Sequence, residues 1–177
     1  MSKQWPAAPA IGLDPAARYT ATISTTLGEM KAELFAKDAP NTVNNFVFLA
    51  RENFYDGVVF HRIIKDFMVQ TGDPTGTGMG GPGYKFSDEL NTPQNYERGM
   101  LAMANSGPNT QGSQFFICHA DLKGRLPKNY TIFGQVTQGL ESLDAIATVP
   151  VGPSPQGERS KPQTEVKIQS VTIEEVK

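Results

Sequence analysis

The sequence of 177 residues is poor in the side chains that build most reactive or metal-binding sites. It contains one cysteine, Cys118, which cannot form an internal disulfide and so fits a reducing compartment. Of the two histidines, His61 has neither a second histidine nor a cysteine at metal-ligand spacing, and we interpret His119 as a residue at a strand end. We therefore expect no metal site.

Charge concentrated in one sign and long apolar runs are also missing. The 16 Lys and Arg residues oppose 18 Asp and Glu residues, and no run of like charges provides the basic surface that nucleic acid requires. No stretch approaches the ~18 apolar residues of a membrane span. Pro6, Pro9 and Gly12 interrupt the N-terminus where a signal peptide would need its apolar core. We expect a cytoplasmic protein that binds neither nucleic acid nor membrane.

The length suits one domain, which would bury roughly two thirds of its extended surface. Residues 1–17 are rich in proline and alanine and show no core periodicity, so we predict an N-terminal extension to a domain over residues 18–177. Trp5, the only tryptophan, lies in this extension and is interpreted as a docking anchor or a loose tail residue. The sequence leaves open whether the extension packs on the domain. We expect a monomer.

Alternating apolar and polar residues predict a mainly β fold. Residues 19–24 and 30–35 form a predicted hairpin, and residues 101–104, 113–118, 131–136 and 163–176 are further predicted strands. The last of these has one phase slip, as a β-bulge would produce. Helices are predicted from a cap at residues 38–40 to about residue 51, and again over residues 140–147. Many strands and two helices favour an antiparallel barrel capped by helices, because closure removes exposed edges.

A glycine-rich stretch over residues 76–81 satisfies the dinucleotide-binding pattern G-x-G-x-x-G. That site needs a helix opening on the last glycine, whereas Pro82 and Gly83 follow here. We therefore interpret the stretch as a loop that needs positive φ angles or close backbone approach.

Residues 60–73, FHRIIKDFMVQTGD, place one guanidinium, that of Arg62, among apolar and aromatic residues. The stretch has no serine or cysteine to act as a nucleophile. The Arg62 guanidinium donates hydrogen bonds and stays charged near neutral pH. An arginine on a strand is usually a solvated or ion-paired surface group. If it has a function here, chemistry that needs only positioning and polarisation fits.

Residues 101–116, LAMANSGPNTQGSQFF, have the character of half a peptide-binding groove. Small residues adjoin a backbone with unused donors and acceptors, and Gln114 and Phe116 lie on one side of a strand. An extended ligand could pair with the backbone edge near Asn105, while Phe67, Met68 and Phe116 enclose a compact apolar ring.

Four segments, in this order, closely resemble the cyclophilin family of peptidyl-prolyl cis-trans isomerases: FHRIIKDFMVQTGD, GTGMGGPGYKFSDE, MANSGPNTQGSQFFI and YTIFGQV. The resemblance covers about residues 19 to 176. It implies a closed eight-stranded antiparallel β-barrel capped by two α-helices. It also implies an enzyme that accelerates rotation about Xaa-Pro bonds and assists protein folding without a cofactor, its partners being proline-containing peptides and unfolded or flexible proteins.

By position, the resemblance matches Arg62 to the family's catalytic arginine. It assigns the substrate groove to Phe67, Met68, Gln70, Gly76, Ala104, Asn105, Ser106, Gln114, Phe116 and Leu126. Tyr130 stands where the best-studied members have a histidine, and could edge the pocket or cap a strand. Arg125 or Leu122 takes the place of a tryptophan that those members carry beside the pocket. Because of these departures, the family's cyclosporin-type binding is not assumed for this chain.

Two other functions compete with the isomerase. A proline-peptide binding module or chaperone would hold the ligand with little turnover, but it would not need a donor such as Arg62 near the prolyl nitrogen or carbonyl. A carrier of small apolar ligands would need an open barrel, whereas the Leu, Ile, Val and Phe content indicates a filled one.

Overall fold

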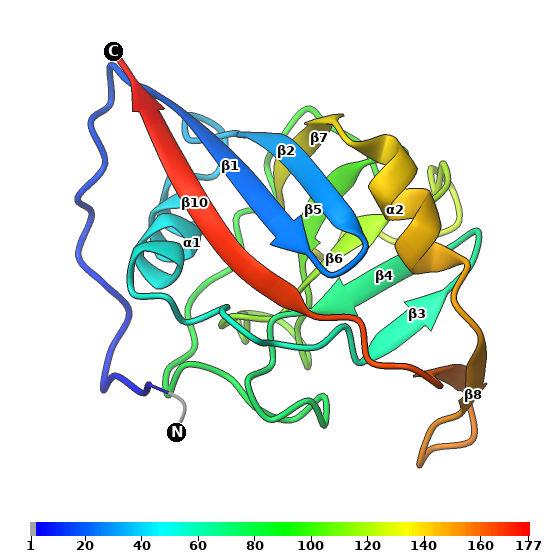
Figure 1. Cartoon of the computed structure of the whole chain (residues 1–177). Helices are drawn as coiled ribbons and strands as arrows, with labels where there is room; N and C mark the ends of the chain where they lie inside the picture. Colours follow the sequence, from blue (N-terminus) through cyan, green and yellow to red (C-terminus); the bar gives the residue numbers. More distant parts are fainter. Residues whose placement is uncertain (1–2) are drawn as a thin grey trace.

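The computed structural model describes residues 3–177 and shows a curled antiparallel sheet with two helices and a small hairpin (Figure 1). The elements follow in the order β1 (Arg18–Thr25), β2 (Gly28–Leu34), α1 (Pro40–Arg51), β3 (Arg62–Ile64), β4 (Met68–Thr71), β5 (Met100–Met103), β6 (Phe115–Cys118), β7 (Ile132–Gln138), α2 (Leu140–Ala147), β8 (Val151–Pro153), β9 (Arg159–Pro162) and β10 (Ile168–Val176). Strands β8 and β9 form a hairpin of their own, outside the large sheet.

The large sheet has eight strands in the order β10-β1-β2-β7-β5-β6-β4-β3. Its two edges meet where the segment before β3 runs beside the start of β10, and the Ile168 N–H of β10 donates to the Val58 carbonyl at 2.8 Å. Val59 bridges Lys167 there, and the Phe60 N–H donates to the Val166 carbonyl at 2.8 Å. The predicted eight-stranded antiparallel barrel with two helices is therefore confirmed, but a short bridge rather than a continuous ladder closes it.

The C-terminal strand carries the bulge that the sequence predicts. In the β1–β10 pairing, Ser24 lies opposite Ser170 but Thr25 lies opposite Ile168, so Gln169 is the additional residue. The strand itself is shorter than the predicted range of 163–176. The hairpin that precedes it, β8–β9, was not predicted.

Aromatic side chains fill the interior of the barrel. Phe46 of α1 meets Tyr55, Phe115 and Phe133, with ring centroids 5.2–5.4 Å apart. All four are fully buried. Pairs of this kind add to the free energy gained by burying the rings, so they hold α1 against the sheet. The interior is thus packed with side chains, as the composition predicts.

Helix α1 is capped by a distant carboxylate. The sequence predicts a cap within residues 38–40, and the helix does begin at Pro40, but the N-cap residue Ala39 has no side chain able to accept a hydrogen bond. Instead, the backbone N–H and the hydroxyl of Thr42 donate to Glu89 Oε1 at 2.7 and 2.8 Å. A negative charge at this end also stabilises the helix dipole.

The N-terminal segment, residues 3–17, contains no helix or strand and runs along the outside of the fold (Figure 1). The ring of Trp5 packs against Phe48 and Phe54, at centroid distances of 5.0 and 5.9 Å. Its backbone N–H donates to the Pro82 carbonyl at 2.9 Å. Of the two roles left open for Trp5, the structure shows the docked one.

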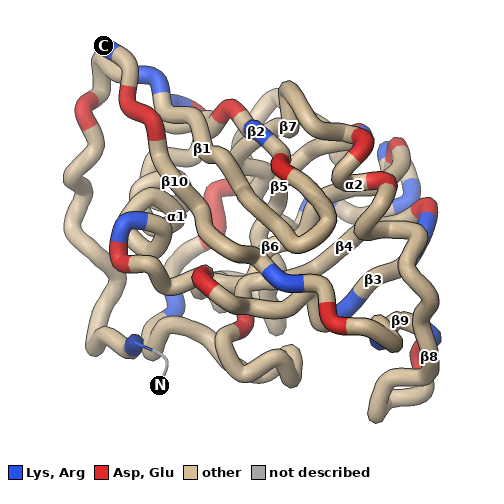
Figure 2. Tube along the Cα trace, in the orientation of Figure 1, with Lys and Arg blue, Asp and Glu red and all other residues tan. Residues whose placement is uncertain are grey.

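Positive and negative residues are interspersed over the fold (Figure 2). Several of them form ion pairs, such as Lys177 with Asp14 at 3.3 Å. Within residues 3–177, no helix is both long enough and apolar enough to cross a membrane.

Candidate active site

A groove of about 870 Å³ opens beside β3, β4 and β6. It contains most of the residues that the sequence assigns to a site, namely Arg62, Phe67, Met68, Gln70, Gly76, Ala104, Asn105, Phe116, Leu126 and Tyr130. Gln114 lies directly behind the groove, where its Oε1 accepts a hydrogen bond from Gln70 at 3.1 Å. Ser106 is not part of the lining, and its N–H donates to Thr110 Oγ1 at 2.8 Å.

Strand register aligns the central groove residues. Arg62 of β3 lies opposite Gln70 of β4, which in turn lies opposite Phe116 of β6. Residues at directly opposed positions project from the same face of a sheet, so the three side chains form a row across the strands. The register of three short strands thus brings residues far apart in sequence into one site.

The Arg62 side chain is about one third exposed and is held on several sides. Its Nη1 donates to Gln70 Oε1 at 3.3 Å, and its guanidinium carbon lies 5.9 Å from the Phe67 ring centroid. Nε and Nη2 donate to the two carboxylate oxygens of Glu158 at 2.8 and 2.9 Å. The hydrogen bond to Glu158 is the main reason that the pKa of Arg62 is raised. Arg62 is therefore a fixed, permanently charged donor.

Two carboxamides extend this network to the glycine-rich loop. Gln114 accepts from Gln70, and its Nε2 donates to the carbonyls of Gly78 and Gly80, each at 2.9 Å. Gly78 adopts a φ of 89°, which agrees with the predicted need for positive φ angles in this loop. The loop is thereby anchored to the sheet that carries Arg62.

An apolar pocket adjoins the guanidinium. Met68 and Phe116 are almost fully buried, and Leu126 packs beside them. The Phe116 ring meets the Tyr130 ring edge-on at 5.6 Å. Tyr130 is in turn anchored by its backbone, which exchanges hydrogen bonds with the Tyr96 hydroxyl at 2.7 and 3.0 Å. The pocket can therefore enclose a compact apolar ring beside a cation.

Comparison with known proteins agrees with this geometry. A family model described as "Cyclophilin type peptidyl-prolyl cis-trans isomerase/CLD" matches residues 20–173. The chain belongs to this family. Like its relatives, this cyclophilin is an enzyme that accelerates cis–trans rotation about Xaa-Pro peptide bonds.

Its relatives match along nearly their whole length. Peptidyl-prolyl cis-trans isomerase CYP18-1 of Arabidopsis thaliana is 47% identical over 156 residues, which cover 86% of this chain and 94% of the relative. Peptidyl-prolyl cis-trans isomerase-like 3 of Homo sapiens is 46% identical, with the same coverage. A crystal structure of a Cryptosporidium parvum cyclophilin superimposes with a TM-score of 0.82 at 38% identity, covering 89% of this chain and 98% of that one. The resemblance seen in the sequence is therefore confirmed.

His61 also lines the groove, beside Gly78. Strand alternation predicts that His61 faces away from Arg62, its neighbour in the sequence. His61 itself directly precedes β3. Burial is the largest influence on its pKa and lowers it. His61 is thus a neutral wall of the groove near neutral pH.

The β8–β9 hairpin forms a further wall that sequence reasoning missed. It contributes Ser154, Pro155 and Glu158 to the lining. Proline and glycine in this stretch indicate only a turn, and Glu158 is 96 positions away from its partner Arg62. The sequence shows only one acidic residue in a short turn. No motif relates the position of that residue to the position of Arg62, so the pair could not be predicted.

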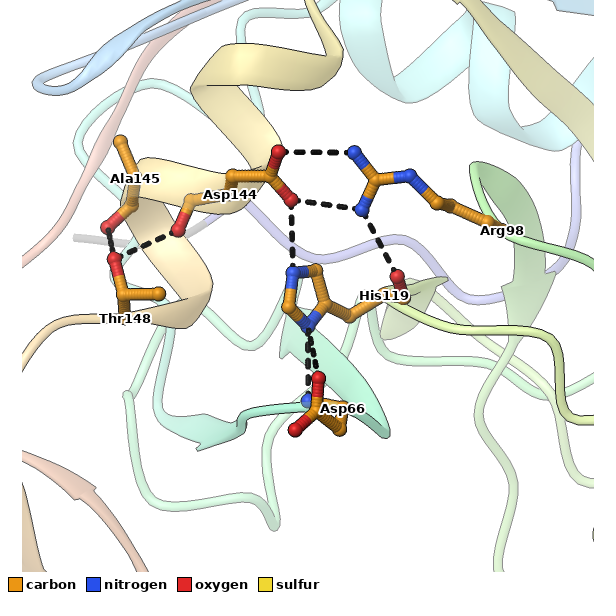
Figure 3. Close-up of polar contacts among 6 residues, drawn as sticks. All are labelled: Asp66, Arg98, His119, Asp144, Ala145 and Thr148. Atoms are coloured by element: carbon orange, nitrogen blue, oxygen red, sulfur yellow. Dashed lines mark hydrogen bonds and ion pairs between the residues drawn. The ribbon is translucent and has the colours of Figure 1, made fainter.

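A polar cluster centred on the buried His119 joins the turn between β3 and β4 to its surroundings (Figure 3). His119 Nδ1 accepts from the Asp66 N–H at 2.8 Å, while its backbone N–H donates to the Phe67 carbonyl at 2.9 Å. On its other side, His119 Nε2 bonds Asp144 Oδ1 at 2.9 Å, and Asp144 forms a two-point pair with Arg98 at 2.7 and 2.9 Å. His119 thereby ties the turn that carries Phe67 to helix α2.

Proposed function

We propose that the groove of this cyclophilin holds the prolyl ring and that Arg62 lowers the rotation barrier by donating to the prolyl nitrogen or carbonyl region. The observation that carries this proposal is the position of Arg62. Its guanidinium lies at the edge of the pocket formed by Phe67, Met68 and Phe116, with its orientation fixed by Gln70 and Glu158. A positioned donor of this kind is what the reaction needs.

Rotation about a peptide bond meets a barrier of ~18–20 kcal/mol because amide resonance must be broken. At the twisted transition state the prolyl nitrogen regains a lone pair. A donor aimed at that lone pair stabilises the transition state more than either planar ground state, and such a difference is the requirement for catalysis. Twisting also reduces the charge separation of the amide. The apolar walls at Met68 and Phe116 therefore favour the twisted form.

The free energy that Arg62 and the pocket can contribute matches the lowering of the barrier that the reaction requires. Uncatalysed isomerisation takes about 10–100 s. A typical turnover of ~10 s⁻¹ then requires an acceleration of roughly 10²–10³, or about 3–4 kcal/mol. One charge-assisted hydrogen bond contributes about 1.5–3 kcal/mol. Fixing the ring in the pocket while the preceding residue rotates supplies the remainder.

We propose proline-containing peptides in unfolded or flexible proteins as substrates, with a role in protein folding. A Cryptosporidium parvum cyclophilin determined in the presence of the dipeptide Ala-Pro supports this class, at a TM-score of 0.80 and 38% identity. We propose a monomer in the cytoplasm with no nucleic-acid or membrane partner. We also propose residues 18–177 as the isomerase domain and residues 1–17 as its extension, which the family match from residue 20 supports.

Binding of cyclosporin-type ligands is not part of this proposal. Leu122, one alternative for the missing tryptophan, is fully buried, and Arg125 Nη1 lies 3.4 Å from the Asp66 carbonyl. Neither residue belongs to the groove lining, whereas Leu126 does.

Exchange spectroscopy on a short Ala-Pro peptide tests the function. The wild-type protein is expected to accelerate cis–trans exchange, and Arg62→Ala to lose most of that acceleration, about 10- to 100-fold, because one charge-assisted bond is removed. Peptide affinity, followed by titration, is expected to change only a few-fold, since the apolar walls remain. If the wild-type protein binds the peptide but leaves exchange unchanged, the protein is a binding module rather than an isomerase.

A further inference from the structure

Glu158, the acidic partner of Arg62, lies outside the large sheet. Glu158 directly precedes β9, and β9 lies beside β3. The two carboxylate oxygens meet Nε and Nη2 of Arg62 at 2.8 and 2.9 Å. Partly exposed ion pairs usually contribute little to stability, but two-point arginine–carboxylate pairs are an exception because their geometry is fixed. The pair therefore orients the guanidinium plane.

The turn of the hairpin presents Glu158 in a defined place. The Ser154 N–H donates to the Glu158 carbonyl at 2.7 Å, and the Glu158 N–H donates to Ser154 Oγ at 3.2 Å. Gly157 has a φ of 87°, a conformation that favours glycine and lets the chain enter β9. The carboxylate is thus positioned by its own turn before it meets Arg62.

The ion pair leaves Arg62 able to bind a ligand. A guanidinium has five N–H donors. Glu158 uses two and Gln70 uses one, so two remain without a nitrogen or oxygen acceptor among residues 3–177. One of these two, the second N–H of Nη1, makes a weak contact with Met68 Sδ at 3.9 Å. A carboxylate that blocked the site would occupy the donors facing the apolar pocket, whereas Glu158 occupies the Nε edge. Holding the arginine is the role that this geometry fits.

The ionised state of Glu158 is secured by the same contact. The hydrogen bond from Arg62 is the largest cause that lowers the pKa of Glu158, to about 2. The carboxylate is therefore charged whenever the protein is near neutral pH.

We propose that Glu158 is a positioning residue for the isomerase reaction, fixing the plane of Arg62 so that its free N–H groups point at the twisting Xaa-Pro bond. This inference rests on the proposed role of Arg62. It assigns a part in turnover to the β8–β9 hairpin, which reaches the reaction through Arg62 without touching the reacting atoms.

A double-mutant cycle tests the inference on the full chain with an Ala-Pro peptide. Glu158→Ala is expected to lower kcat/KM about 10-fold, because a small displacement of a catalytic group has large effects on rate. Peptide affinity is expected to change less than about 2-fold. In the Arg62→Ala background, Glu158→Ala should have almost no further effect, since there is no guanidinium left to position.

NMR of the Arg62 side chain provides a second readout beside the double-mutant cycle. The Arg62 Nε–H resonance is expected to exchange slowly with water in the wild-type protein and rapidly in Glu158→Ala. Glu174→Ala, an exposed acid on β10 outside the groove, serves as the matched control and should change neither quantity. If the alanine variant is unstable, Glu158→Gln keeps the side-chain volume, replaces one acceptor oxygen with a donor, and should lower kcat/KM in the same direction.

The outcomes separate the two proposals. If Arg62→Ala is inactive but Glu158→Ala retains or exceeds wild-type activity, Glu158 does not position the arginine and this inference fails alone. An equal loss from Glu158→Ala in both backgrounds also overturns it, because the effect would not pass through Arg62. If Arg62→Ala is fully active, the proposed role of Arg62 fails, and the inference with it.

Discussion

At the scale of single residues, the role proposed for Arg62 depends on the shape of the guanidinium as well as on its charge. Arg62 reaches Glu158 and Gln70 at once, through Nε and Nη2 on one side and Nη1 on the other. A lysine ammonium is a point charge on a flexible chain and cannot reproduce this fork. Charge alone would therefore leave the donor unpositioned.

We expect Arg62→Lys to lower kcat/KM for an Ala-Pro peptide about 10- to 100-fold, which corresponds to losing one charge-assisted bond. The measurement is NMR exchange at matched protein concentrations, with peptide affinity and thermal unfolding as controls. Activity within about 2-fold of wild type would mean that a positive charge near the pocket suffices.

The residues of the groove were predictable where strands carry them. Arg62, Gln70 and Phe116 lie on β3, β4 and β6, whose register aligns them. Their sequence blocks occur in the family's order, so position could be transferred residue by residue. Glu158 lies in a turn between two three- to four-residue strands. Its contact with Arg62 depends on how the hairpin folds over the sheet, which no local pattern encodes.

At the scale of elements, the turn between β3 and β4 depends on helix α2 for its position. Asp144 of α2 binds both Arg98 and His119, and His119 holds the backbone of Asp66 and Phe67 (Figure 3). The hydrogen bond from Arg98 is the largest cause that lowers the pKa of Asp144, to about 2, and the bond from His119 adds to it. A carboxyl whose pKa is lower in the folded state stabilises that state when ionised.

This pKa predicts how Asp144→Asn alters stability with pH. Above the ordinary carboxyl pKa of 3.8 the carboxylate contribution is complete, and it is lost as pH falls toward 2. We expect the variant to be less stable by about 1 kcal/mol near neutral pH, the upper end for partly exposed pairs, and the difference to shrink between about pH 4 and pH 2. Urea unfolding at a series of pH values measures it.

Glu174→Gln, an exposed acid on β10, provides the control for this series and should show no comparable convergence. A wild-type advantage that persists unchanged at pH 2 would contradict the assignment, because the pair would then not depend on the ionised carboxylate.

Among the elements, those with clear periodicity were predictable. β1 and β2 alternate between buried and more exposed positions, and the bulge at Gln169 in β10 was visible as a phase slip. The short strands β5 and β6 are buried at every position, so their apolar runs indicate burial but not neighbours. β8 and β9 have neither alternation nor apolar character, which explains why the hairpin was missed.

At the scale of the whole molecule, the groove lies where the barrel is least continuous. The two edges of the sheet meet through the bridge between Val59 and Lys167, and Val59 itself lines the groove. The family resemblance predicts eight strands and two helices, because order and number of elements follow from the matched blocks. It does not predict how many ladder bonds close the barrel, since these depend on sheet twist and on the chain leading into β10.

The N-terminal segment lies outside the barrel, and its first described residues contact the glycine-rich loop. The Trp5 N–H donates to the Pro82 carbonyl at 2.9 Å, and Gln4 Nε2 donates to the Gly81 carbonyl at 2.7 Å. Both carbonyls lie in the loop whose Gly80 carbonyl accepts from Gln114. The segment therefore restrains the loop from outside while Gln114 restrains it from inside.

We expect Trp5→Ala to destabilise the protein by about 1–2 kcal/mol, less than the ~3–5 kcal/mol for a fully buried ring because Trp5 is only partly buried. For a chain of this size that corresponds to a fall in Tm of roughly 2–8 °C. Since Trp5 is the only tryptophan, the native emission maximum should also be blue-shifted and should move to the red on unfolding.

Ile11→Ala is the matched control, because Ile11 lies in the same segment but is 55% exposed, so its truncation removes little packing. Its Tm should stay close to that of the wild-type protein. A native emission maximum like that of free tryptophan in water, together with an unchanged Tm for Trp5→Ala, would show that residues 3–17 do not dock in solution. A blue-shifted maximum with a lowered Tm for Trp5→Ala alone would show that the aromatic contact with Phe48 and Phe54 holds the segment against the barrel.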